Sequence, residues 1–279
     1  MKVAVCYSGM IRGFLNNIEN HKKFILSQYD CDVYLSFWDV YGFGYLPFSR
    51  YKSDKHIRYN MEENKREIIP VTESDLIDES VKKEIVDRLN PVNYIFESFT
   101  SYEPTLTERE RPLIEKYGYS ETNCNIGQLL AWNTLGGYYR IHECGEMVKN
   151  SGIKYDVVVR MRPDSILEDV VNLQTPDKGI IYANQHSSWG GDAINDSLLY
   201  GDMESMEVYR NMHNHLIDIF HQTQGPGNAA EHLLYVYLTN MGLKINMDLN
   251  TPTHSNHNYR EKEKSKELQN SEWFKSLSK

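Results

Sequence analysis

The sequence lacks the features that mark membrane, secreted and zinc-binding proteins. No apolar run approaches the roughly 18 residues that a membrane-spanning helix needs, and the first residues do not form a basic segment followed by an apolar one. The four cysteines are irregularly spaced and include no Cys-x-x-Cys pair, which argues against a zinc site and against a disulfide framework. We therefore expect a cytoplasmic protein without a transmembrane segment.

Positive charge is also scarce. The chain has 30 Lys and Arg against 39 Asp and Glu, which gives a formal net charge of -9. Proteins that bind nucleic acid usually carry an excess of Lys and Arg on one face, so we expect no nucleic-acid partner. In such a chain an anionic ligand must be met by local cations, and an Arg at a strand end is therefore informative.

Apolar residues recur along the chain in patterns that alternate between those typical of strands and those typical of helices. Continuous or β-branched apolar runs predict strands over residues 2–7, 32–38, 93–99, 156–161, 180–183 and 243–247. Helical spacing predicts helices over residues 11–29, 74–89, 125–149, 203–220 and 229–241. Such alternation predicts an α/β fold with a mostly parallel central sheet flanked by helices. Segments 41–60 and 100–123 fit neither pattern and are expected to be long loops.

Two predicted strands end in residues suited to anions. In open α/β sheets, ligands bind outside the carboxyl ends of the strands. The first strand is followed by Ser8, Gly9 and Arg12, where glycine permits close backbone approach and the next helix start offers free N–H groups. An ordinary turn with a surface Arg explains the same residues equally well.

The predicted central strand, 156–161, ends in a second charged cluster. Alternation along a strand points Arg160, Arg162 and Asp164 to one side. Guanidinium groups suit bidentate phosphate contacts, and a carboxylate together with diphosphate oxygens suits a hard divalent cation. The alternative is a structural ion pair between Arg and Asp at the strand end.

Three further positions carry candidate chemistry. Asp196 ends a loop that also contains a tryptophan and a pair of glycines. The flat aromatic face is suited to a sugar ring, although such loops also form simple turns. Glu231 lies in the first turn of a predicted helix, where it also favours the helix dipole. His254 and His257 follow the last predicted strand and are either metal ligands or exposed loop residues.

The order of these motifs resembles the GT-A glycosyltransferases, most closely their small viral and bacterial members. Those proteins open with a hydrophobic strand ending in Ser-Gly-x-x-Arg, continue with a strand ending in Trp-Asp, and carry Arg-x-Arg-x-Asp. The corresponding segments here are 8–12, 38–39 and 160–164. The family's Asp-x-Asp motif is followed by a glycine loop, an acidic residue at a helix start and a histidine, as here, but its first Asp is Arg162 in this chain. The resemblance covers about residues 1–257, a single Rossmann-like GT-A domain, and leaves 258–279 as a charged tail.

The resemblance implies transfer of a sugar from a nucleoside-diphosphate sugar, with UDP the family's commonest nucleotide, to a hydroxyl of a glycan or glycoprotein. It assigns the nucleotide to Ser8, Gly9, Arg12 and Asp39. It assigns the diphosphate to Arg160, Arg162 and a Mn²⁺ or Mg²⁺ ion on Asp164, with His254 or His257 completing the metal shell. Asp196 or Glu231 would be the general base of an inverting reaction. A nucleotidyltransferase and a non-catalytic nucleotide- or carbohydrate-binding protein on the same scaffold are the alternatives.

Overall fold

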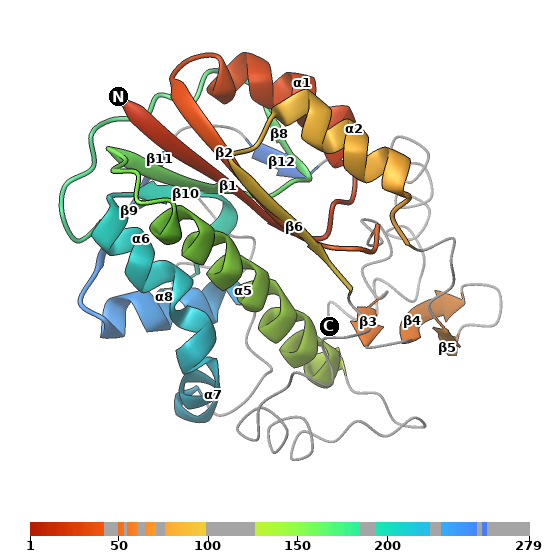
Figure 1. Cartoon of the computed structure of the whole chain (residues 1–279). Helices are drawn as coiled ribbons and strands as arrows, with labels where there is room; N and C mark the ends of the chain where they lie inside the picture. The colour runs from red at the N-terminus through yellow and green to blue at the C-terminus, as the bar shows by residue number, and fades with distance from the viewer. Residues whose placement is uncertain are drawn as a thin grey trace.

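A central sheet between two layers of helices forms the described part of the chain (Figure 1). The computed structural model describes residues 1–41, 50–52, 55–60, 65–70, 76–98, 126–184, 193–223, 230–249 and 253–255. At 50–52, 55–60, 65–70, 126–133, 221, 248–249 and 253–255 only the backbone is described.

The main sheet has seven strands, and six of them run in the same direction. In spatial order they are β11 (Lys244–Leu249), β9 (Ile180–Asn184), β10 (Asn195–Gly201), β7 (Val157–Met161), β1 (Lys2–Gly9), β2 (Asp30–Trp38) and β6 (Asn93–Glu97). Only β10 is antiparallel to its neighbours β7 and β9 among these strands. The predicted α/β fold with a mostly parallel sheet is thus confirmed.

Helices cover both faces of this sheet (Figure 1). One face carries α1 (Phe14–His21), the π-helical turn η1 (Lys22–Leu26) and α2 (Glu79–Leu89); the other carries α5 (Ile126–Asn150), α6 (Met203–Arg210), α7 (Met212–Gln222) and α8 (Ala230–Asn240). Alternate residues of β1 face the two layers: Val3 and Val5 lie in the core under α1, and Ala4 and Cys6 lie in the core under α5. The period of two along a strand thus builds two separate cores.

Several predicted boundaries differ from the structure. The helix predicted from residue 11 begins at Phe14, because Gly9 and Arg12 take left-handed φ values of 108° and 42° and interrupt the chain before it. The helix predicted over 203–220 divides at Asn211 into α6 and α7. Strand β10 falls partly on a segment that the sequence predicted as a loop.

The expected loop at 41–60 is wrong for its second half. A three-stranded antiparallel sheet forms there from β3 (Arg50–Lys52), β4 (Lys55–Asn60) and β5 (Lys65–Pro70). A two-stranded sheet joins β8 (Ser165–Leu167) to β12 (Thr253–Ser255). The predicted loop at 100–123 and the tail at 258–279 lie outside the described residues.

A buried histidine ties α1 to the segment that follows the central strand. His21 is fully buried, its Nε2 donates to the carbonyl oxygen of Ser165 at 2.7 Å, and its ring stacks on Tyr7 with centroids 5.5 Å apart. Burial lowers the pKa of His21 from the usual 6.5 to about 4, so the ring is neutral at pH 7.

We predict that this histidine weakens the fold in mild acid. Between pH 6.5 and about 4 the unfolded chain binds a proton at His21 that the folded chain excludes, so stability falls as the pH falls. The full effect is worth about 3 kcal/mol, since one pKa unit corresponds to about 1.4 kcal/mol. Urea unfolding at pH 7 and pH 5 should therefore show a smaller loss of stability in His21→Gln than in the wild type. In the control His215→Gln, which changes an exposed histidine, the loss should equal that of the wild type; equal losses in all three proteins would contradict the assignment.

Helices α5 and α6 approach closely at a glycine. A Cβ atom on Gly145 would lie 2.1 Å from Cδ of Arg210, so the glycine makes room for that side chain. Arg210 is buried and is paired with Glu146 of α5 and with Glu207, whose Oε2 accepts from its Nε at 2.6 Å. The two helices are therefore joined by ion pairs along one side of the sheet.

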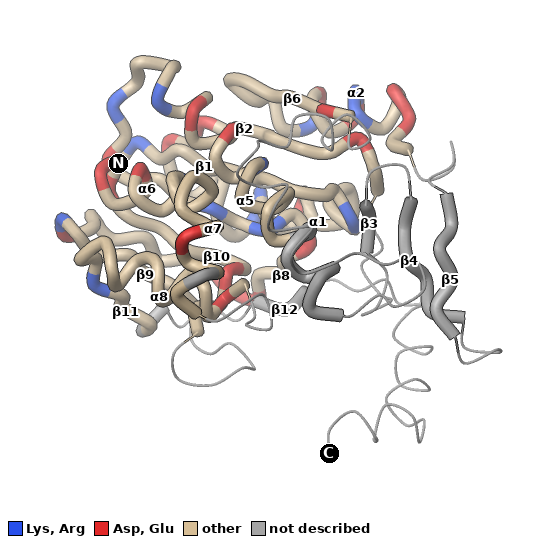
Figure 2. The backbone as a smooth tube through the Cα atoms, turned by 90° about the horizontal axis from the view of Figure 1, so that it is seen from below, with Lys and Arg blue, Asp and Glu red and all other residues tan. Residues whose placement is uncertain are grey.

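Charge of both signs is spread along the described chain. Figure 2 shows Lys and Arg positions interspersed with Asp and Glu, unlike the continuous basic stripe of a nucleic-acid-binding surface. No helix among the described residues is both long and apolar enough to cross a membrane. Because charges of both signs are mixed along the described chain, an anionic ligand would have to be met by a local cluster of guanidinium groups.

Candidate functional site

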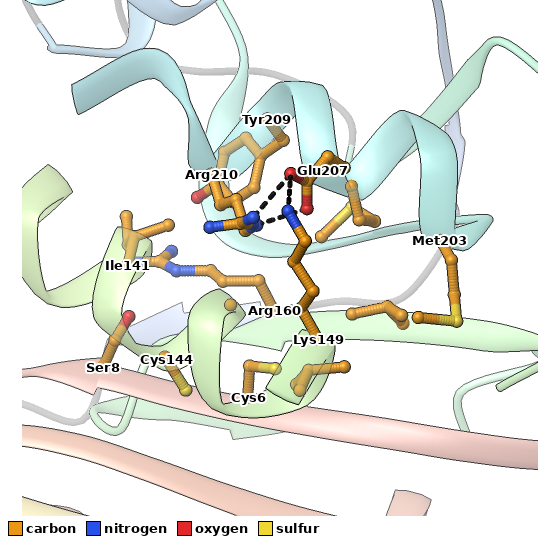
Figure 3. A pocket seen from close by; sticks show the side chains of 14 residues that line it. Cys6, Ser8, Ile141, Cys144, Lys149, Arg160, Met203, Glu207, Tyr209 and Arg210 are labelled. Atoms are coloured by element: carbon orange, nitrogen blue, oxygen red, sulfur yellow. Dashed lines mark hydrogen bonds and ion pairs between the residues drawn. The ribbon is translucent and has the colours of Figure 1, made fainter. Parts of the chain in front are cut away.

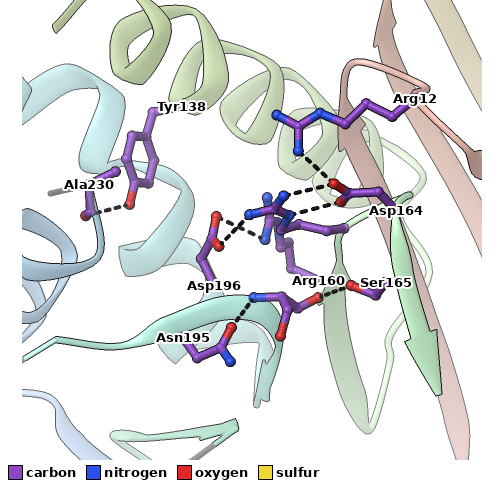
Figure 4. A network of polar contacts seen from close by, with 10 residues as sticks. Arg12, Tyr138, Arg160, Asp164, Ser165, Asn195, Asp196 and Ala230 are labelled. Carbon is purple, nitrogen blue, oxygen red and sulfur yellow. Dashed lines mark hydrogen bonds and ion pairs between the residues drawn. The ribbon is translucent and has the colours of Figure 1, made fainter. Parts of the chain in front are cut away.

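Five charged side chains meet at one edge of the main sheet (Figure 4). Arg12 follows β1, Arg160 lies in β7, and Arg162 and Asp164 follow β7, so four of the five come from the carboxyl ends of two adjacent parallel strands. Asp196 comes from the start of β10, which reaches the same edge because that strand runs in the opposite direction. This is the edge at which open α/β sheets bind their ligands.

The carboxylate of Asp164 is held between two guanidinium groups. Arg162 donates to it in a bidentate manner, from Nε to Oδ1 at 2.9 Å and from Nη2 to Oδ2 at 2.8 Å. Arg12 donates from Nη1 to Oδ2 at 2.6 Å. Burial alone would raise the pKa of Asp164, but the charges of Arg162 and Arg12 hold it well below its usual range. Asp164 is therefore a buried anion at all ordinary pH values.

The carboxylate of Asp196 bridges Arg162 and a third arginine, Arg160. Its Oδ1 accepts from Arg162 Nη1 at 3.3 Å, and its Oδ2 lies 3.4 Å from Arg160 Nη1. Burial raises the pKa of Asp196, yet Arg160 and Arg162 lower it below the usual value overall. With three arginines (Arg12, Arg160, Arg162) and two aspartates (Asp164, Asp196), this arginine cluster carries a net charge of 3 − 2 = +1.

The charged side chains of the cluster differ in their exposure to solvent. The side chains of Arg12 and Arg162 are 32% and 26% exposed, whereas that of Asp164 is 2% exposed. Both arginine side chains are therefore half-buried, and the carboxylate between them is buried. Such a surface binds anions, because planar guanidinium groups match the geometry of phosphate oxygens.

Glu231 lies beside Asp196, in the first turn of α8. Ile194, next to β10, donates its backbone N–H to the carbonyl oxygen of Glu231 at 3.1 Å. Burial raises the pKa of the Glu231 carboxyl, and the neighbouring charge of Asp196 raises it further. The two carboxylates predicted as alternative bases thus differ: Asp196 is stabilised as an anion by two arginines, and Glu231 is the stronger base.

The remaining nucleotide-binding candidates lie on the same edge. Ser8 is buried at the end of β1, and Gly9 has the left-handed φ that explains a glycine there. The strained φ of Arg12 is held by its backbone N–H, which donates to the carbonyl oxygen of Tyr41 at 2.7 Å. Asp39 follows β2, and its backbone links that strand to β6 and to the start of α2. Ser8, Gly9 and Asp39 therefore lie at the ends of adjacent strands.

The predicted metal site does not fit this arrangement. Both oxygens of Asp164 accept hydrogen bonds from guanidinium groups, and a divalent cation there would face two positive charges. Among the described residues no three His, Cys, Asp or Glu side chains are grouped as a metal shell. The backbone of His254 pairs with Ile166 in β8 and so lies near Asp164, but its side chain is not described, and His257 lies outside the described residues.

One buried arginine was not predicted from the sequence. Arg140 of α5 is fully buried, pairs with Glu97 at the end of β6, and stacks on Trp38 at the end of β2, with its Cζ 4.4 Å from the ring centroid. Its signal in the sequence is a charged residue inside the apolar stripe of a helix. The fold thus places a fourth guanidinium group at the same edge of the sheet, between the ends of β2 and β6.

Comparison with known proteins gives distant structural similarity only. No model of a known protein family matches the chain, and no curated protein sequence is similar to it. A solved structure with a similar chain arrangement is the apo form of mouse xyloside xylosyltransferase 1, with a TM-score of 0.38 and 8% sequence identity over 87% of this chain and 82% of that one. This degree of similarity assigns neither a family nor an activity.

Proposed function

We propose that the chain is a glycosyltransferase that moves a sugar from a nucleoside-diphosphate sugar, a UDP-sugar by its family resemblance, to a hydroxyl of a glycan or glycoprotein. The observation that carries this proposal is the arginine cluster, which presents a surplus positive charge at the ligand-binding edge of the sheet. The order of motifs along the chain, which resembles the GT-A glycosyltransferases, supports the choice of a sugar transfer among reactions that use a diphosphate.

The half-buried guanidinium groups are suited to the diphosphate of the donor. Arg12 and Arg162 are partly exposed to the solvent, and Asp164 binds both of them. Negative charge grows on the diphosphate as the bond to the sugar breaks, and preorganised cations at that position stabilise the transition state. In this proposal the backbone of Ser8 and Gly9 and the residue Asp39, at the neighbouring strand ends, contact the nucleoside.

Glu231 is the proposed base of a single, inverting displacement. The acceptor oxygen bonds to the anomeric carbon while the bond from that carbon to the phosphate oxygen breaks and the nucleoside diphosphate leaves with the electron pair. The acceptor proton moves to the carboxylate of Glu231, whose raised pKa makes it the better acceptor. Asp196 serves to balance Arg160 and Arg162.

In this proposal the arginines supply the charge that a metal supplies in many transferases. Both oxygens of the Asp164 carboxylate accept hydrogen bonds from positively charged guanidinium groups, which would repel a cation, so donor binding should not require one. The presence of Arg162 where the family motif has an Asp is consistent with that substitution of charge.

Calorimetric titration with UDP and a panel of nucleoside-diphosphate sugars tests the proposal. We expect binding by the wild type that is unchanged by EDTA, and binding weakened about 10- to 100-fold in Arg162→Gln and Arg12→Gln, since hydrogen bonds to charged groups are worth about 1.5–3 kcal/mol. Lys178→Gln removes the same charge at an exposed site away from the cluster and should bind like the wild type.

Four results would count against the proposal. Equal donor affinities in Arg12→Gln and Lys178→Gln would show that the arginine cluster does not bind the donor. If EDTA abolished donor binding and Mn²⁺ restored it, donor binding would require a metal ion. Tight donor binding without hydrolysis or transfer to any glycan would favour a non-catalytic binding protein, and release of pyrophosphate from a nucleoside triphosphate would favour a nucleotidyltransferase.

A further inference from the structure

A small cavity lies between the sheet and the helices α5 and α6 (Figure 3). Its volume is about 60 Å³, and its walls come from β1, β7, α5 and α6. One water needs roughly 10–15 Å³, and pockets for drug-sized ligands hold roughly 300–1,000 Å³. The cavity therefore admits an ion or a few waters and excludes a nucleotide or a sugar.

Buried polar atoms on three of its wall residues have no hydrogen-bond partner among the described residues. They are the hydroxyl of Ser8, the Nε and Nη1 of Arg160 and the hydroxyl of Tyr209. These three residues are 4%, 6% and 1% exposed. Figure 3 shows the Arg160 side chain running between Ser8 on one side and Tyr209 on the other. Each unsatisfied buried group costs about 1–3 kcal/mol, so a ligand common to all three is expected.

Arg160 shares its carboxylate partner in the arginine cluster with Arg162. Asp164 is shared by Arg12 and Arg162, and Asp196 is shared by Arg160 and Arg162, so two carboxylates serve three guanidinium groups. The 3.4 Å contact of Arg160 with Asp196 is an ion pair without a hydrogen bond.

The other charged groups of the wall are balanced among themselves. Arg210 and Lys149 contact Glu146 and Glu207, two positive charges against two negative ones. Burial holds the pKa of the Cys144 thiol and of the Tyr209 hydroxyl well above their usual values, so neither becomes an anion that could neutralise Arg160. The groups without a hydrogen-bond partner are thus donors, and one of them is the guanidinium group of Arg160, whose ion pair with Asp196 includes no hydrogen bond.

We infer that this cavity is a binding site for a small monovalent anion of the halide class, held by the guanidinium group of Arg160 and the hydroxyls of Ser8 and Tyr209. The site uses Ser8 and Arg160, which the proposed function also uses, but anion binding there can be measured without any transferase activity. Chloride would satisfy the three donors and neutralise Arg160 without displacing Asp196.

Thermal unfolding of the full chain in bromide tests the site. Sodium gluconate is replaced stepwise by sodium bromide at constant ionic strength, and a specific anion raises the Tm with a saturable dependence on its concentration. In Tyr209→Phe the bromide concentration at half of the Tm shift should increase about tenfold, since a hydrogen bond to a charged group is lost. Tyr7→Phe is the matched control, because it removes an equally buried and unpartnered hydroxyl in the core under α1, away from the cavity, and should respond like the wild type.

Crystals of the wild type grown in bromide give a second measurement that does not depend on any variant. An anomalous scattering peak beside Nε or Nη1 of Arg160 is expected. A bromide response that is linear or equal in Tyr209→Phe and Tyr7→Phe, or a cavity that contains only ordered water in those crystals, would overturn the inference.

Discussion

Replacing Glu231 by glutamine is expected to lower the rate of sugar transfer by about 10²- to 10⁴-fold, the usual contribution of a general base. Glutamine has nearly the same shape but does not accept the acceptor's proton, so donor affinity should be unchanged. In the wild type the rate should rise with pH as Glu231 loses its proton, and the midpoint should lie above the usual value of a glutamate because burial and Asp196 raise its pKa. Steady-state kinetics with the donor identified by calorimetry measures both effects.

The control for that experiment is Glu204→Gln. Glu204 occupies the first turn of α6 as Glu231 occupies that of α8, so both residues favour a helix dipole, but Glu204 is exposed and distant from the arginine cluster. Equal transfer rates in the two variants would show that Glu231 only stabilises the start of its helix and is not the general base. A large loss in Asp196→Asn together with a normal rate in Glu231→Gln would instead assign the base to Asp196.

Removal of the Asp164 carboxylate is expected to destabilise the fold by about 3–5 kcal/mol, because it leaves two guanidinium groups without their buried partner. Urea unfolding of Asp164→Ala measures this loss. The same variant should lose most donor affinity, because Arg12 and Arg162 are no longer held in place. Addition of Mn²⁺ should restore neither property.

A double-mutant cycle separates this role from that of a metal ligand. In Arg162→Met/Asp164→Leu both partners of the bidentate pair are replaced by apolar groups, and the combined loss of stability should be smaller than the sum of the two single losses. Additive losses, or an Asp164→Ala protein as stable as the wild type, would contradict the view that Asp164 is the counter-ion of two arginines.

The sequence predicted the fold well where local pattern and burial agree. The β-branched run Val157 to Val159 is fully buried in the sheet, and the predicted α/β alternation is what the structure shows. Strand β10 was missed because its first three residues are polar and half-buried and its last four are all buried, so no alternation with a period of two is visible.

The candidate site could be located from the sequence but not resolved in detail. Alternation correctly placed Arg160, Arg162 and Asp164 at one strand end, yet it could not show that Arg162 and Asp164 would bind each other. That contact is completed by Arg12, which lies 152 residues away in the chain. The pairing of Arg140 with Glu97 also joins residues of different elements. The periodicity of a sequence shows which face of an element is buried, and it does not show which residue of another element lies opposite.

The reversed direction of β10 links the two acidic residues of the site mechanically. The backbone bond from Ile194 to Glu231 joins the beginning of β10 directly to the first turn of α8. Asp196, two residues further along, holds Arg160 and Arg162. The proposed proton acceptor and the counter-ion of the two arginines are therefore joined through one backbone hydrogen bond, so a displacement of the first turn of α8 would be expected to move both carboxylates together.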